Sequence, residues 1–117
     1  MILGKLLISI VLANFEPGAQ NVNHQFELKD GKWKEACFES SPGMRIEYEF
    51  AADQTLNFNI HWHEGKNVTN SVDHKNLKSL KGAFEPSIKQ TYCLSWFADK
   101  SKTIKAQYKY SHVKKKN

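Results

Sequence analysis

The fold of this chain is decided by residues 44 to 62, which read MRIEYEFAADQTLNFNIHW. Apolar and polar side chains alternate there in two runs, Met44 to Phe50 and Leu56 to Trp62. Because side chains two residues apart on a β-strand point to the same face, each run predicts a strand with one buried and one solvated face. Between the runs, Ala52-Asp53-Gln54 interrupts the alternation and predicts a turn from one strand to the next.

Similar stretches extend outward from this segment in both directions. They predict further strands over His24–Leu28, Lys32–Phe38, Asn67–Val72, Leu77–Phe84, Thr91–Phe97 and Thr103–Val113. Turn signals such as Asp30-Gly31 and Ser41-Pro42-Gly43 separate the stretches. About seven or eight short strands at this spacing predict a single all-β domain, an antiparallel β-sandwich over residues 20 to 113.

The composition limits what kind of protein this is. The chain has 117 residues, of which 40% are hydrophobic and 25% are charged, as expected for one globular domain. This composition excludes a collagen, a coiled coil and a protein with several membrane spans. The net charge is +5, but Arg45 is the single arginine among 17 basic residues. Since base recognition and bidentate phosphate binding favour arginine, we predict no nucleic-acid partner.

The N-terminal segment differs from the rest of the chain. Residues 2 to 15 are almost wholly apolar, with Lys5 as their one charge, and small residues follow. This pattern predicts a signal peptide over residues 1 to 19, cleaved after Ala13 or Ala19, and a buried N-terminal strand is the alternative. The apolar run is shorter than the roughly 20 residues of a membrane span. We therefore expect a secreted or periplasmic chain without a transmembrane span.

Residues 114 to 117 form a basic tail that contains Lys114, Lys115 and Lys116. A frayed, solvated C-terminus is the simplest interpretation of this tail. The functional alternative is a weak attraction to an anionic surface such as lipid headgroups.

The chain contains two cysteines, Cys37 and Cys93. An even number of cysteines in an exported chain favours one disulfide, and two buried free thiols are the alternative. Metal binding by the two sulfurs is disfavoured, because neither cysteine belongs to a C-x-x-C pair.

The sharpest chemical pattern is the pair His61 and His63. Their spacing places both imidazoles on one face of the predicted strand, where they could share a Zn²⁺ or Cu²⁺ ion. His74 is the candidate third ligand, and the alternatives to it are Glu64, Asp73 and His24. Three protein ligands would leave one position open for water or substrate. The competing interpretation is an ordinary solvated face of a half-buried strand.

Other features point away from catalysis. Ser95 and Ser101 lack the context of a nucleophile, and the sequence contains no glycine-rich phosphate loop. We therefore predict that the protein is not an enzyme. Three tryptophans are most simply core or strand-end residues, but an exposed one would indicate a binding patch: Trp33, Trp62 and Trp96.

Several segments resemble the GOLD (Golgi dynamics) domain family. They are Glu35-Ala36-Cys37-Phe38, Met44–Phe50, Leu56–Ile60, Gly82–Pro86 and Tyr92–Trp96. The resemblance implies a small, jelly-roll-like β-sandwich in which Cys37 pairs with Cys93. The cargo receptors of that family continue into a coiled coil and a membrane span. This sequence carries neither and is more similar to small exported bacterial proteins made of a leader and one such domain.

Together these observations predict an exported, non-enzymatic binding or interaction module. Its ligand is a protein or a small molecule that the sequence does not identify. The alternative is a Zn²⁺- or Cu²⁺-binding protein that uses His61 and His63 on one strand face.

Overall fold

The computed structural model of the chain describes residues 20–99 and 102–115, with side chains from residue 24 onward. It contains six strands, which are β1 (Gln20–Lys29), β2 (Trp33–Ser40), β3 (Met44–Glu64), β4 (Asn67–Phe84), β5 (Gln90–Phe97) and β6 (Thr103–Lys114). Every pairing between them is antiparallel. Within these ranges no helix is long and apolar enough to cross a membrane. The predicted signal peptide, residues 1 to 19, lies outside the described residues.

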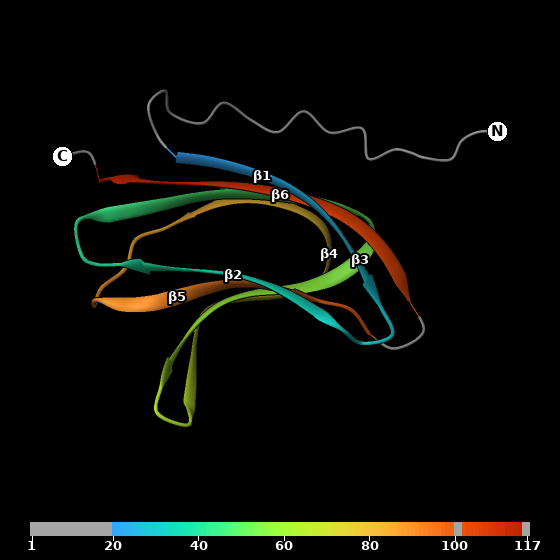
Figure 1. Ribbon diagram of the computed structural model, residues 1–117, viewed down its shortest axis with the longest axis horizontal. Coiled ribbons are helices and arrows are strands. Elements are labelled where there is room, and N and C mark those ends of the chain that lie inside the picture. The colour runs from blue at the N-terminus through green and yellow to red at the C-terminus, as the bar shows by residue number, and fades with distance from the viewer. Residues whose placement is uncertain (1–19, 100–101, 116–117) are drawn as a thin grey trace.

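β3 organises the fold, because its 21 residues pair with β4, β5 and β6. Residues Met44–Ala52 pair with β6 and residues Asn57–Trp62 pair with β5, while β4 follows the other edge of β3. The resulting strand order is β1-β6-β3-β5-β2, with β4 beside β3. The sheet curls so that β1 and β6 lie over β2 and β5, and β3 runs through both layers (Figure 1). This architecture confirms the predicted antiparallel β-sandwich.

The core lies between the two layers and is built from the apolar members of the alternating strands. Its least exposed apolar side chains are Ile46, Phe58, Ile60, Leu94 and Ile104. Trp96 connects the layers, because its ring centroid lies 5.5 Å from that of Phe58 in β3 and 4.3 Å from that of Tyr108 in β6. Aromatic contacts therefore join β5 to the opposite layer.

The structure has six strands where the sequence predicted about seven or eight. Residues 52 to 54 do not reverse the chain, because the pairing of β3 with β4 shifts register between Ala51 and Leu56 and then continues. The polar side chains at this irregularity bond to β6 instead. The Asp53 carboxylate accepts a hydrogen bond from the Lys105 backbone N–H at 3.0 Å. β4 likewise continues through residues 73 to 76, so two pairs of predicted strands are each one long strand.

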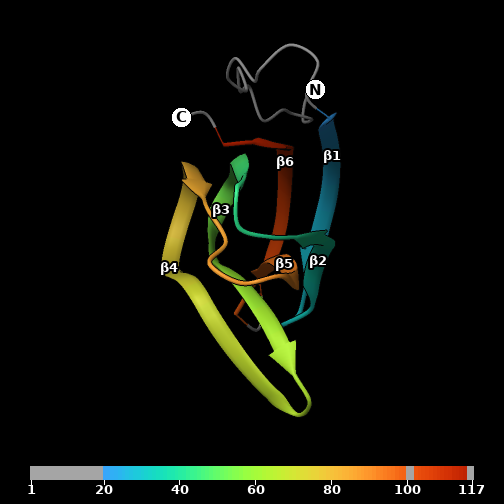
Figure 2. The same ribbon diagram turned by 90° about the vertical axis from the view of Figure 1, so that its left-hand side faces the viewer.

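β4 has an open edge and begins in a projecting hairpin. Its 18 residues pair with β3 on one side, and no described strand pairs with its other side. The turn around Gly65, which has a φ of 61°, carries the ends of β3 and β4 beyond the rest of the sandwich (Figure 2). Three lysines are exposed along β4: Lys75, Lys78 and Lys81.

The predicted disulfide is present between Cys37 and Cys93, with an S–S distance of 2.08 Å. The two residues lie directly opposite each other in the β2–β5 pair. The bond therefore links the edge strand β2 to β5, on the face that points away from the core.

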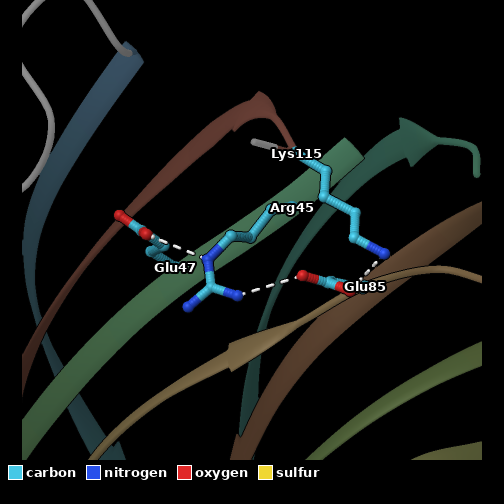
Figure 3. A network of polar contacts seen from close by, with 4 residues as sticks. All are labelled: Arg45, Glu47, Glu85 and Lys115. Atoms are coloured by element: carbon cyan, nitrogen blue, oxygen red, sulfur yellow. Dashed lines mark hydrogen bonds and ion pairs between the residues drawn. The ribbon is translucent and has the colours of Figure 1, made fainter. Parts of the chain in front are cut away.

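A network of charged side chains joins the start of β3 to the C-terminal segment (Figure 3). The Arg45 guanidinium contacts Glu47 at 3.0 Å and Glu85 at 3.1 Å, and Lys115 contacts Glu85 at 3.2 Å. Lys115, and next Arg45, lower the pKa of the Glu85 carboxyl. The backbone N–H of Lys115 also donates to the carbonyl of Gly43 at 2.7 Å. Lys115 thus takes part in the fold, and attraction of the basic tail to an anionic surface stays a prediction.

Candidate functional site

The outer face of β2, β5 and β3 brings together polar groups that are far apart in the sequence. The pairing of these strands places Cys37, Cys93 and His61 in one row across the face. Glu35 of β2 and Asn59 of β3 lie in the adjacent row, on either side of Ser95. We call Glu35, Asn59, His61 and His63 the histidine cluster.

His61 is the centre of this cluster and is buried, with 6% of its surface exposed. Its Nδ1 atom lies 2.7 Å from the Asn59 Oδ1 atom, and its Nε2 atom lies 3.3 Å from a carboxylate oxygen of Glu35. An amide oxygen can only accept a hydrogen bond, so Nδ1 carries the proton of the neutral ring. The Nε2 lone pair of that ring is then directed toward the Glu35 carboxylate.

The surroundings of His61 favour its neutral form. Burial lowers the pKa of the imidazole, the Glu35 carboxylate opposes that shift, and His63 adds to it. The His63 ring is exposed and lies edge-on to the His61 ring, with 5.1 Å between the centroids. The cluster therefore offers two imidazoles and one carboxylate within a small volume, close to the disulfide.

Of the other predicted metal ligands, His24 lies on β1 opposite Tyr108, and Glu64 is the last residue of β3. His74 lies on β4 opposite Phe58, and Asp73 is opposite Asn59 and contacts Lys75 at 3.5 Å. In the described part of the chain, the potential ligand atoms that gather within 4.8 Å are those of Glu35, His61 and Cys93. The Cys93 sulfur is held in the disulfide. The use of His74 as a ligand stays a prediction that this geometry does not favour.

We did not predict Glu35 from the sequence, because Glu35 lies on β2 and His61 lies on β3, far apart along the chain. The cysteine pairing is the sequence feature that could have indicated the position of Glu35. If Cys37 pairs with Cys93, strands β2 and β5 are neighbours, and Glu35 shares the outer face of β2 with Cys37. The further step from β5 to β3 required the register, which the alternation of side chains does not supply.

A second feature of the outer face is an exposed aromatic patch. Trp33 is 67% exposed at the start of β2 and lies directly opposite Phe97 of β5. The Lys75 ammonium lies 5.9 Å from the centre of the Phe97 ring. We call Trp33, Phe97 and Lys75 the Trp33 patch. It is distinct from Trp96, which is buried in the core.

A serine–histidine contact between β2 and β6 has the appearance of a catalytic pair. The Ser40 hydroxyl lies 2.9 Å from the Nε2 atom of His112. Ser40 is buried, however, with only 5% of its surface exposed. The hydroxyl is therefore shielded from a substrate, and the contact is a structural hydrogen bond between the layers.

No protein-family model and no curated protein sequence matches the chain. The resemblance to the GOLD domain family accordingly stays a prediction. Among solved structures, the fold is similar to that of PliG from Aeromonas hydrophila, a periplasmic lysozyme inhibitor of g-type lysozyme. That match has a TM-score of 0.63 and 9% identity, over 86% of this chain and 92% of that one.

A further similarity is to the Yersinia pseudotuberculosis-derived mitogen, with a TM-score of 0.51 and 10% identity over 85% of this chain and 89% of the mitogen. Sequence identities this low show a shared fold and leave function open. The comparisons thus identify the chain by its architecture, as an antiparallel β-sandwich similar to that of the lysozyme inhibitor PliG.

Proposed function

We propose that the chain is an exported, non-enzymatic module that binds a protein partner through the Trp33 patch. The exposure of Trp33 is the observation that carries this proposal. A large aromatic side chain left in water at a sheet edge forgoes the stabilisation of burial, and tryptophan is among the residues that contribute most to protein interfaces.

The surroundings of Trp33 support its role as an anchor. Phe97 lies beside it on the next strand, and Lys75 lies over the Phe97 ring, so a polar rim adjoins an apolar centre. The disulfide links the same two strands four residues further along β2. β2 and β5 thus present the patch from a cross-linked support, which reduces the entropy cost of binding.

Export is supported by the disulfide, because such bonds persist in oxidising compartments. The kind of partner is suggested by the similarity in fold to PliG, which inhibits a lysozyme. A lysozyme is therefore the first partner to test, and we propose an inhibitor-like role. The intact mass of the exported protein would show whether residues 1 to 19 are removed.

The test is to measure binding of the oxidised chain to immobilised g-type lysozyme, together with the residual lysozyme activity. Replacing Trp33→Ala should weaken binding by about 30-fold or more, as loss of an interface tryptophan does. The matched control is Ile88→Ala, because Ile88 is also an exposed apolar residue but lies outside the patch. Equal binding by both variants would exclude the patch. Absence of binding by the unmodified chain would exclude lysozyme as the partner.

A further inference from the structure

We propose that Glu35, His61 and His63 bind one divalent transition-metal ion, Zn²⁺ or Cu²⁺, on the outer face of β2, β5 and β3. This inference is independent of the Trp33 patch and goes beyond the proposed binding function. It also replaces the ligand set expected from the sequence, because Glu35 takes the place of His74.

The first argument is the orientation of the His61 ring. The Asn59 Oδ1 atom accepts a hydrogen bond from the Nδ1–H group at 2.7 Å. This leaves Nε2 as the ring atom that can bind a metal ion on the outer face. Metal-binding histidines typically donate their other ring N–H to an oxygen in this way, which fixes the ring and its tautomer. Asn59 therefore supplies the hydrogen-bond acceptor that fixes the ring of a metal-binding histidine.

The second argument is the distance between His61 and Glu35. Nε2 and the carboxylate oxygen are 3.3 Å apart. A charge-assisted hydrogen bond between such groups is shorter, about 2.7 to 2.9 Å. Two ligand atoms that each lie about 2.1 Å from one tetrahedral ion are about 3.4 Å apart. The observed distance thus matches an edge of a metal coordination tetrahedron better than a direct hydrogen bond.

The third argument is the position of His63. Its ring lies edge-on to His61 with a centroid distance of 5.1 Å, and it is exposed. The proposal requires the His63 side chain to adopt a rotamer that turns a ring nitrogen toward the ion. Two imidazoles and one carboxylate form a donor set that suits Zn²⁺ and Cu²⁺ and is poor for Mg²⁺ or Ca²⁺. Glu35 is one-third exposed, so the ion could enter from solvent and keep a water ligand.

The site would connect two strands that do not pair directly. Glu35 belongs to β2, and both histidines belong to β3, with β5 between them. A bound ion would therefore bridge β2 to β3 across β5, between the row of His61 and the disulfide and the adjacent row of Glu35. An ion that binds only the folded chain stabilises it by mass action, so metal should raise the melting temperature.

The test is a calorimetric titration of Zn²⁺ and Cu²⁺ into the full, oxidised chain, with Mg²⁺ as the negative control. We expect about one ion per chain for Zn²⁺, Cu²⁺ or both. Glu35→Gln and His63→Ala should each weaken binding by about tenfold or more. Both replaced residues are at least partly exposed, so these variants should fold. A parallel melting experiment with and without chelator should show a metal-dependent rise in the unmodified chain and a smaller rise in these two variants.

His74→Ala is the matched control, since it removes an exposed histidine from the neighbouring strand β4. Unchanged binding in this variant supports the site with Glu35. Loss of binding in His74→Ala but not in Glu35→Gln would overturn it in favour of the ligand set expected from the sequence. Binding weaker than about millimolar in the unmodified chain would overturn the metal site altogether.

Discussion

The two faces of β3 and β5 both carry buried side chains but have opposite chemistry. On the inner face, Phe58 and Trp96 contact other aromatic rings of the core. On the outer face, Asn57, His61 and Ser95 are 5% to 6% exposed, although none of the six described strands forms a second layer over them. The inner face is formed by apolar packing. On the outer face, neighbouring side chains of the same sheet cover the polar groups.

This difference shows that the buried polar groups of the two strands lie on the outer face. Burying a polar group has a cost unless the group is hydrogen-bonded. Asn57 meets that requirement by accepting the Asn76 N–H at 3.0 Å, and His61 meets it by donating its Nδ1–H to the Asn59 Oδ1 atom at 2.7 Å. The organised polar groups of the outer face are therefore the ones on which the proposed metal site rests.

The strongest way to test the comparison is to remove an aromatic ring from the inner face. Phe58→Ala should lower the free energy of unfolding by about 3 to 5 kcal/mol, because it leaves a cavity in the core. The control on the other face is Ser95→Ala, for which we expect less than about 1 kcal/mol. Urea denaturation measures both values. Equal losses in the two variants would show that the faces do not differ energetically.

The next largest effect should come from the disulfide on the outer face. Replacing both Cys37 and Cys93 with Ser should cost about 2 to 4 kcal/mol, since the bond joins residues 56 positions apart and restricts the unfolded chain. Urea denaturation of the unmodified chain with and without reductant provides the matched comparison. If free thiols were found in the purified protein, or if reductant had no effect, the bond would not be a stabilising element.

The smallest effect should be a pH dependence from one buried histidine, His61, and one half-buried histidine, His112. Burial lowers the pKa of His61 and of His112. The folded chain then holds fewer protons than the unfolded chain, so this part of the stability is complete above the unfolded pKa of about 6.5 and declines as the pH falls below it. Melting temperatures between pH 8 and pH 5 should show this decline, and His61→Gln with His112→Gln should reduce it. A melting temperature that rises toward pH 5 would contradict the assignment.

The sequence was sufficient to predict the fold class, because alternation separates inner from outer side chains without knowledge of the pairing. It identified Met44 to Phe50 and Leu56 to Trp62 correctly as strand, but wrongly as two strands. A polar segment such as residues 52 to 54 can form a turn or an irregularity in a continuing strand. Which of these forms depends on a neighbour, here β6, to which Asp53 and Gln54 bond.

The candidate site was predictable only in part, and for a related reason. His61 and His63 belong to one strand, so their proximity follows from local geometry. Glu35 and His74 come from other strands, and their positions depend on register. The expected ligand His74 lies opposite Phe58, whereas the unexpected Glu35 lies one row from His61. Contacts within a strand can be inferred from sequence, but contacts between strands need the complete pairing.

The open edge of β4 has a consequence for the behaviour of the protein in concentrated solution. The edge of this 18-residue strand that pairs with no described strand offers a template on which a second copy could extend the sheet. Lys75, Lys78 and Lys81 recur along that strand, and two copies brought edge to edge would oppose like charges. Three of the 17 basic residues thus disfavour edge-to-edge pairing at β4, a role for positive charge that involves no ligand.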